Sequence, residues 1–162
     1  MSSRVIAVSG IKNSGKTTII SRLLPCLDSL GLRVAVIKHD GHSFEADREG
    51  TDTFKFLAAG AYGAAIFDGE KFQAVKRERV TWQQLAELYP EADLIILEGF
   101  KDSDCPKIEI LRSGLSSSPC CDEKTVIALV TDTGYRISGV PTYSPDDIQG
   151  IAKFIFDYNR RQ

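Results

Sequence analysis

Two glycines, a lysine and two threonines form the most informative group of residues in this 162-residue sequence. Gly10 and Gly15 are followed directly by Lys16, Thr17 and Thr18. The run from the first glycine to the first threonine fits G-x-x-x-x-G-K-[ST], the pattern of a loop that surrounds nucleotide phosphates with main-chain amides and a lysine. Glycine permits backbone conformations closed to other residues and a close approach to a ligand. The group therefore predicts a phosphate-binding loop.

Each side chain of this loop has an expected role. Lys16 would reach the β- and γ-phosphates and act in catalysis, and the hydroxyl of Thr17 would bind Mg²⁺. Thr18 would help to hold the α-phosphate. Such a site also needs a carboxylate at the end of a neighbouring strand, and Glu98 ends the apolar run DLIILEG. Aspartate is the commoner residue at that position. Here we assign the metal role to Glu98, because it stands at the expected place at the end of the strand.

A second group of polar residues follows the apolar run RVAVI, in the stretch KHDGHSFEADREGTDT. Asp40 would hold Mg²⁺ through water or orient an attacking water, so we include it among the catalytic candidates. Lys38, His39 and His42 would meet a second anionic ligand or the γ-phosphate. Two alternatives stay open: a zinc site built on the H-x-x-H spacing of the histidines, and a solvated surface loop.

The surrounding elements indicate an α/β protein. Strands are predicted over 4–9, 33–39, 63–67, 72–76, 93–99, 107–111 and 125–131. Helices are predicted over 16–30, 51–59, 81–88 and 145–158, the last with Ser144 as N-cap before Pro145. Strands that are apolar throughout and alternate with helices are typical of a parallel sheet covered on both faces. We expect a three-layer P-loop NTPase-like sandwich with a mostly parallel sheet.

Length and composition restrict the kind of protein. The chain suits a single domain over 1–162, and its net charge of −2 is not that of a nucleic-acid binder. No apolar run reaches the roughly 20 residues that a membrane-spanning helix needs, and no signal peptide is apparent. The four cysteines are too few for a disulfide scaffold. We expect a cytoplasmic protein with reduced thiols that binds neither nucleic acid nor membrane.

With these residues in hand, the sequence resembles the molybdopterin-guanine dinucleotide biosynthesis protein B family, MobB. The resemblance covers most of the chain. It rests on the blocks GIKNSGKTT, VIKHDGHSFEADREGTDT, AAGA and LIILEGFKDSDCPKIEILR, which occur in the order and spacing of the family. The pairing of EGFK with PKIE is the most distinctive part.

The resemblance implies a GTP-binding accessory protein of molybdenum cofactor biosynthesis that requires Mg²⁺ and hydrolyses GTP slowly. It further implies a homodimer that assists the nucleotidyltransferase joining GMP to molybdopterin, with molybdopterin itself as a possible ligand. Carried over by position, the phosphate site comprises Lys12, Asn13, Ser14, Gly15, Lys16, Thr17 and Thr18. Glu98 falls at the Mg²⁺-linked position of the family, and Asp40 is also carried over from the family by its position.

Three other residues are candidates for ligand contacts. Lys101 in EGFK and Lys107 in PKIE would attract the pterin phosphate or a partner at the same end of the sheet, or are simply solvated lysines. Guanine is usually recognised by the aspartate of N-K-x-D, and the nearest match here is LVTD, which ends in Asp132. Leu129 stands in place of the asparagine. Asp132 is therefore the candidate base-binding residue.

Two further functions remain open beside the GTP-dependent adapter. An ATP-dependent small-molecule kinase or ligase would use the same loop to position a γ-phosphoryl group for transfer to a bound acceptor. Its release of ADP or GDP would depend on that acceptor. A nucleotide-gated binding module would change partner affinity through residues 39–52 with negligible turnover.

Overall fold

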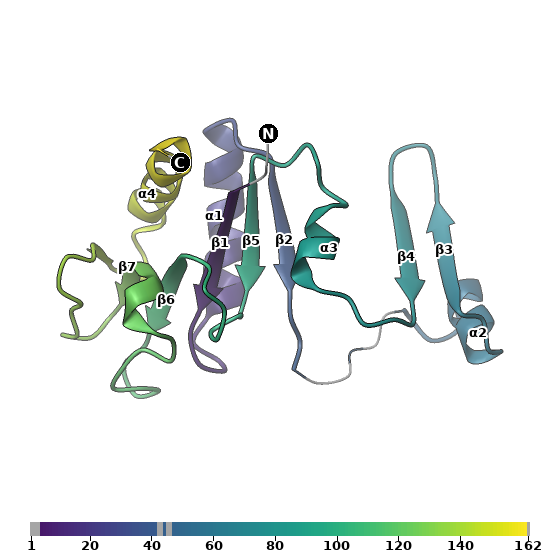
Figure 1. The fold of residues 1–162 in the computed structure, drawn as a ribbon, viewed down its shortest axis with the longest axis horizontal. Coiled ribbons are helices and arrows are strands. Elements are labelled where there is room, and N and C mark those ends of the chain that lie inside the picture. Colours follow the sequence, from purple (N-terminus) through teal and green to yellow (C-terminus); the bar gives the residue numbers. More distant parts are fainter. Residues whose placement is uncertain (1–3, 42–43, 45–46, 162) are drawn as a thin grey trace. The chain divides into compact units, whose positions relative to one another are not determined.

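The computed structural model describes residues 4–41, 44 and 47–161. Helices are interspersed with single strands and with pairs of consecutive strands along the chain (Figure 1). In order they are β1 (Arg4–Ser9), α1 (Lys16–Ser29), β2 (Val34–Lys38), α2 (Asp52–Ala58), β3 (Gly63–Phe67), β4 (Phe72–Lys76), α3 (Trp82–Ala86), β5 (Leu94–Glu98), β6 (Lys107–Leu111), the 3₁₀ turn η1 (Glu123–Thr125), β7 (Val126–Thr131), β8 (Thr142–Tyr143) and α4 (Ile148–Arg161).

Six strands form one sheet in the order β2-β5-β1-β6-β7-β8. Every neighbouring pair in it is parallel. From β1 the chain crosses to the edge strand β2, returns to β5, and then continues on the other side of β1 with β6, β7 and β8. β1 thus lies between β5 and β6, where the order of strands changes direction. In open α/β sheets, ligands bind beyond the carboxyl ends of the strands at such a point. The glycine-rich loop begins there, directly after β1.

Helices cover both faces of this sheet. On one face α1 and α4 pack against alternate residues of the strands, among them Ile6, Ile96 and Ile108. On the other face α3 contributes Trp82 and Leu85 to a second cluster. The burial of both faces explains why the strands are apolar throughout. The predicted α/β class, with its mostly parallel sheet between helices, is confirmed.

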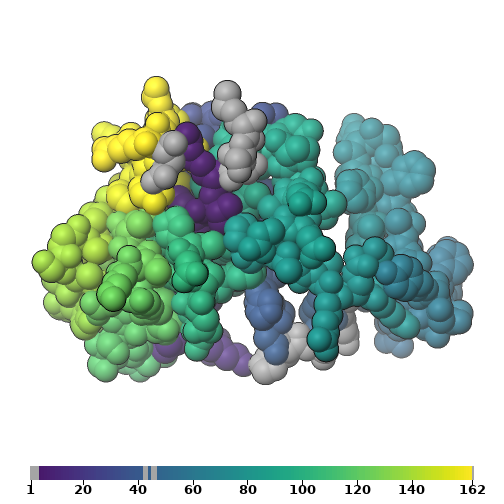
Figure 2. Space-filling view, viewed as in Figure 1, coloured from purple at the N-terminus to yellow at the C-terminus, as the bar shows by residue number. Residues whose placement is uncertain are grey.

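Loops take the place of a helix where α3 does not reach. The odd-numbered residues of β6 point to this face, and the ones that are charged, Lys107 and Glu109, are fully buried. Their partners come from residues 103–105 and 120–125, and Glu109 also accepts from Ser9 of β1. In the space-filling view the green atoms of this part of the chain form an unbroken surface (Figure 2).

The chain divides into two compact units, residues 1–39 with 82–162 and residues 40–81. The first contains the six-stranded sheet. The second contains α2 and the two predicted strands β3 and β4, which pair with each other in an antiparallel ladder instead of joining the parallel sheet. The backbone N–H of Arg77 donates to the carbonyl of Tyr62, and the guanidinium of Arg77 donates to the carbonyl of Leu57. These bonds link hairpin and helix inside this unit.

The start of α4 differs from the prediction. The helix begins at Ile148, and Asp147 is its cap, since its carboxylate accepts from the N–H of Gly150 at 3.0 Å. Ser144 instead accepts from the N–H of Asp146 in the preceding turn. The Ser-Pro signal was wrong by one turn because an aspartate follows that can cap equally well. Among the described residues, no helix has the length and apolarity needed to cross a membrane.

Candidate functional site

The glycine-rich loop leaves β1 through a position that only glycine can fill. Gly10 has φ of 148°, and a Cβ there would lie 2.6 Å from Ser14 Oγ and 2.7 Å from the carbonyl oxygen of Ile110. Any larger residue would push the loop away from β6. The first glycine of the pattern is thus needed for close packing between the loop and its neighbouring strand.

The second glycine starts α1. Gly15 is its N-cap, in the left-handed region at φ 91°. The first helical bond runs from the N–H of Ile19 to the carbonyl of Gly15 at 2.9 Å, so the amides before Ile19 have no acceptor within the helix. The first turn contains no acidic residue, and no side chain caps it. This helix end therefore offers N–H groups and a positive dipole end to an anion.

Lys16 lies within the loop. Its Nζ donates to the carbonyl oxygens of Gly10 at 2.8 Å and Ile11 at 2.7 Å. These bonds hold the ammonium group against the backbone of the loop. A phosphate bound there would accept from the same ammonium group in place of a carbonyl.

Thr17 and Glu98 meet as the pattern predicts. Thr17 Oγ1 donates to Glu98 Oε1 at 2.7 Å, although the two residues are 81 positions apart. Glu98 ends β5, which pairs with β1 in register, and its side chain is 9% exposed. The ammonium of Lys38 lies 3.5 Å from the same carboxylate oxygen. A hydroxyl, a carboxylate and an amine thus converge beside the loop.

The donor set fits Mg²⁺. A hydroxyl and a carboxylate oxygen are hard ligands of the kind that this ion takes, together with phosphate oxygens and water. No cluster of three or more histidine, cysteine, aspartate or glutamate side chains within 4–41, 44 and 47–161 could hold a metal by itself. A cation here would therefore depend on a bound phosphate for its remaining ligands.

The other predicted loop residues surround this centre. Lys12, Asn13 and Thr18 are exposed, and Asn13 takes a left-handed conformation at φ 64°. Ser14 is buried, and its backbone N–H donates to the carbonyl of Ile11 at 3.3 Å. Its hydroxyl has no hydrogen-bond partner in the part of the chain that the structure describes. The loop is closed by its own turn, while its exposed residues face outward.

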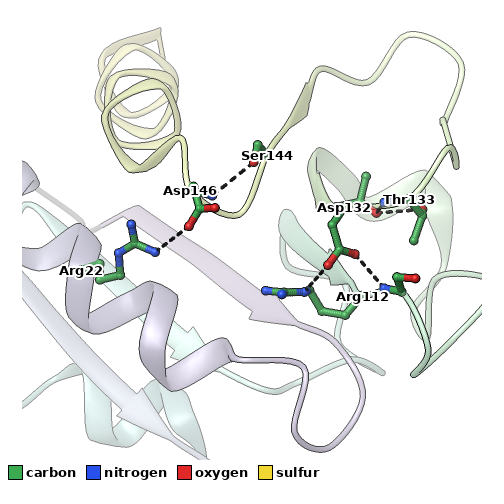
Figure 3. A network of polar contacts seen from close by, with 8 residues as sticks. Arg22, Arg112, Asp132, Thr133, Ser144 and Asp146 are labelled. Carbon is green, nitrogen blue, oxygen red and sulfur yellow. Dashed lines mark hydrogen bonds and ion pairs between the residues drawn. The ribbon is translucent and has the colours of Figure 1, made fainter.

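Asp132, the candidate for base recognition, is already bonded to its own chain (Figure 3). One carboxylate oxygen accepts from Arg112 Nε at 2.9 Å and the other from the N–H of Ser113 at 2.7 Å. The bond from Ser113, followed by the charge of Arg112, holds the pKa of Asp132 below its usual value. A guanine would have to replace one of these donors, and its recognition by Asp132 stays a prediction.

The second polar group is only partly described. Lys38 and His39 belong to the unit with the sheet, whereas Asp40 opens the 40–81 unit, so Asp40 has no defined position relative to the loop. Its catalytic role remains a prediction. His42 lies outside the described residues, and with it the zinc alternative. The ring of His39 lies 5.5 Å from that of Phe100, in the turn that follows Glu98.

The two lysines of the EGFK and PKIE motifs differ. Lys101 is exposed. Lys107 is the first residue of β6 and is fully buried, with Nζ bonded to the carbonyls of Ser103 and Cys105 and to the hydroxyl of Thr125. The prediction that Lys107 faces the carboxyl end of the sheet is wrong, because it lies at the amino end of its strand and its donors are used internally.

Sequence reasoning missed a buried polar cluster below the loop. Glu109 accepts from the hydroxyl of Ser9, from the N–H of Cys120 at 2.8 Å and from the thiol of Cys121 at 3.3 Å. Ser9 directly precedes Gly10, so this carboxylate joins the 112–125 loop to the phosphate loop. The only signal in the sequence was a charged residue inside an apolar strand. All four cysteines are free thiols, as predicted.

Comparison with known proteins agrees with this geometry. The family model for Molybdopterin guanine dinucleotide synthesis protein B, MobB, matches residues 5–132, which include the loop and Glu98. The chain is 28% identical to the molybdopterin-guanine dinucleotide biosynthesis adapter protein of Escherichia coli, over 98% of this chain and 94% of that protein. It is 33% identical to a probable adapter protein of the same name from Bacillus subtilis, over 88% and 86%.

A solved structure is also similar. The crystal structure of Bacillus subtilis MobB superposes with a TM-score of 0.78 at 30% identity, covering 95% of this chain and 96% of the other. The resemblance drawn from the sequence motifs is thereby confirmed.

Proposed function

The chain belongs to the molybdopterin guanine dinucleotide synthesis protein B family, and from that membership we propose that it is a GTP-binding adapter protein in the synthesis of this dinucleotide. The adapter role is taken from the names of its relatives in Escherichia coli and Bacillus subtilis. It would act in the cytoplasm beside the nucleotidyltransferase that joins GMP to molybdopterin.

One observation carries the nucleotide part of the proposal. The positive end of α1, the ammonium of Lys16 and the oxygen pair of Thr17 and Glu98 converge on one place after β1. A triphosphate needs amides for its oxygens, a cation for its β- and γ-phosphates, and oxygen ligands for its metal ion. This arrangement supplies all three.

Mg²⁺ would be held by Thr17 and Glu98. When bound, it would supply the positive charge that bridges the β- and γ-phosphates. Lys16 would exchange the carbonyls of Gly10 and Ile11 for phosphate oxygens. The amides at the start of α1 would hold the anion in place.

Hydrolysis would be slow. Slow turnover is what the family resemblance implies. The residues that would hold the phosphates and the metal ion belong to the unit with the sheet, and the residue proposed to orient the attacking water, Asp40, belongs to the 40–81 unit. The proposed protein is a nucleotide-dependent adapter first and an enzyme second.

The 40–81 unit supports a homodimer. The side chains of Ile66, Phe67 and Phe72 are 60%, 81% and 70% exposed, and the hairpin that carries them has only two strands. β3 contains no charged residue that would keep another strand away from its edge. We assign this edge to a second copy of the chain, because pairing like with like closes the assembly as a symmetric dimer.

The test is nucleotide binding by calorimetry. Lys16→Ala should weaken GTP binding by about 10-fold or more, because a charge-assisted bond of about 1.5–3 kcal/mol is lost. Glu98→Ala should remove most of the Mg²⁺ dependence of that binding. Arg33→Ala, at the opposite end of β2, is a matched control that should bind as the wild type does.

Competition between GTP and ATP, with and without Mg²⁺, decides the base. The proposal requires a preference for GTP. An affinity for ATP equal to that for GTP, together with release of ADP or GDP that depends on a small acceptor molecule, would favour a kinase or ligase instead. Unchanged GTP affinity in Lys16→Ala would overturn the proposal.

A further inference from the structure

Lys38 and Glu98 occupy equivalent places on neighbouring strands. They are register partners in the parallel pair β2 and β5, and each is the last residue of its strand. Side chains in register on adjacent strands point to the same side, so the ammonium and the carboxylate meet at the carboxyl end of the sheet. The distance from Lys38 Nζ to Glu98 Oε1 is 3.5 Å.

The same carboxylate oxygen accepts from Thr17 at 2.7 Å. This is the oxygen pair to which Mg²⁺ has been assigned above. The lysine therefore stands beside the place where a divalent cation would bind. An ammonium group and a metal ion would repel each other there, because both carry positive charge within a few ångströms.

The two partners differ in freedom. The side chain of Glu98 is 9% exposed, whereas that of Lys38 is 55% exposed. A buried carboxylate needs a compensating charge, while an exposed lysine on a flexible stem can leave at little cost. The carboxylate is thus the fixed partner and the lysine the movable one.

We propose that Lys38 is a resident counter-ion of the metal-binding carboxylate, which leaves Glu98 when Mg²⁺ arrives and then binds the terminal phosphate of the nucleotide. The inference rests on the magnesium site of the proposed function. It adds a residue that couples the metal ion to the length of the phosphate chain.

The coupling has a direction. In the absence of a triphosphate, a cation that displaces Lys38 leaves the ammonium without an anion, so Lys38 opposes cation binding. With a γ-phosphate present, the displaced ammonium gains a charge-assisted bond. Lys38 should therefore weaken metal binding to the free protein and strengthen binding of a triphosphate relative to a diphosphate.

The experiment measures Mn²⁺, as a paramagnetic substitute for Mg²⁺, and nucleotides on purified wild type and variants. Lys38→Met keeps the length of the side chain and removes its charge, and Lys38→Arg keeps the charge. Arg33→Met is the matched control, because Arg33 pairs with Asp93 at 3.6 Å at the opposite ends of the same two strands.

In Lys38→Met, we expect nucleotide-free protein to bind Mn²⁺ at least about 3-fold more tightly, since a nearby positive charge is gone. Its preference for a slowly hydrolysed GTP analogue over GDP should fall by about 10-fold, the worth of one charge-assisted bond. Lys38→Arg and Arg33→Met should behave as the wild type does.

Two failures can be told apart. A wild type that binds no Mn²⁺ even with the GTP analogue would overturn the magnesium site and this inference with it. A wild type that binds Mn²⁺ normally, beside a Lys38→Met variant with unchanged metal affinity and unchanged triphosphate preference, would overturn only the role of Lys38.

Discussion

Lys107 and Glu109 lie two positions apart on the same face of β6, both fully buried, and each is satisfied by a different part of the chain. The ammonium bonds to residues of the turn after β5 and to Thr125, and the carboxylate bonds to Ser9 and the two adjacent cysteines. Burial of a charge is costly unless its hydrogen bonds are complete. The PKIE motif therefore joins two loops to the sheet through hydrogen bonds, and only Glu109 among its residues also bonds to Ser9, next to the glycine-rich loop.

The two thiols beside Glu109 act as hydrogen-bond donors. Burial, followed by the charge of Glu109, raises the pKa of Cys120 from 9.0 to about 11. Burial is also the largest cause of the raised pKa of Cys121, about 12. The protonated thiols stabilise the fold at pH values below 9.0, the ordinary thiol pKa, and this stabilisation is lost as the pH rises through about 11 to 12.

Alkylation provides the test. Iodoacetamide reacts only with the thiolate. At pH 8, Cys120 in the folded protein should therefore be labelled about 100-fold more slowly than in urea-unfolded protein, because its thiol pKa is about 11 in place of 9.0. Cys120→Ser and Cys121→Ser variants separate the two signals in mass spectra, and Cys26 is the internal reference. Labelling of Cys120 at the unfolded rate would contradict the assigned role.

At the scale of the elements, α1 and α4 differ in how their first turns are capped. α1 begins at a left-handed glycine without a side-chain cap, so its amides remain available. α4 begins with the carboxylate of Asp147 bonded to Gly150, so one of its amides is satisfied internally. α1 therefore lacks the side-chain cap that stabilises the start of α4.

Asp147→Ala should lower the free energy of unfolding by about 1 kcal/mol, the usual loss for a removed N-cap, and the melting temperature by about 2–4 °C. Asp146→Ala is the matched control. The side chain of Asp146 pairs with Arg22 at 3.4 Å and is 90% exposed, and such surface pairs contribute little (Figure 3). Thermal unfolding followed by circular dichroism measures both, and an equal shift in the two variants would contradict the assignment of the cap.

Elements with strong local signals were predictable. β1, β3, β4 and β6 have the bounds expected from their apolar runs, and the loop motif located the start of α1. What failed depends on competing or distant partners. The direction of Lys107 is set by the turn after β5, and the cap of α4 by a competition between two capping residues. The strand runs of β3 and β4 did not show that the two would pair with each other in a sheet of their own.

At the scale of the whole molecule, the chain joins a sheet with a complete core to a smaller unit that buries little. β3 is exposed at four of its five positions, and β4 at four of five. Large exposed apolar side chains gather in this unit, whereas the strands at the centre of the parallel sheet are buried on both faces. The exposed residues of the hairpin therefore indicate an association surface.

The dimer assigned to this hairpin makes the last prediction. Ile66→Lys places a charge on β3, where pairing of two copies would bring two ammonium groups together, so the variant should be monomeric at concentrations at which the wild type is dimeric. Light scattering after gel filtration measures the mass. Leu115→Lys is the control, because Leu115 is 47% exposed in the other unit. Since the residues proposed to bind GTP belong to the larger unit, both variants should keep GTP affinity, and a dimeric Ile66→Lys variant would exclude this edge as the interface.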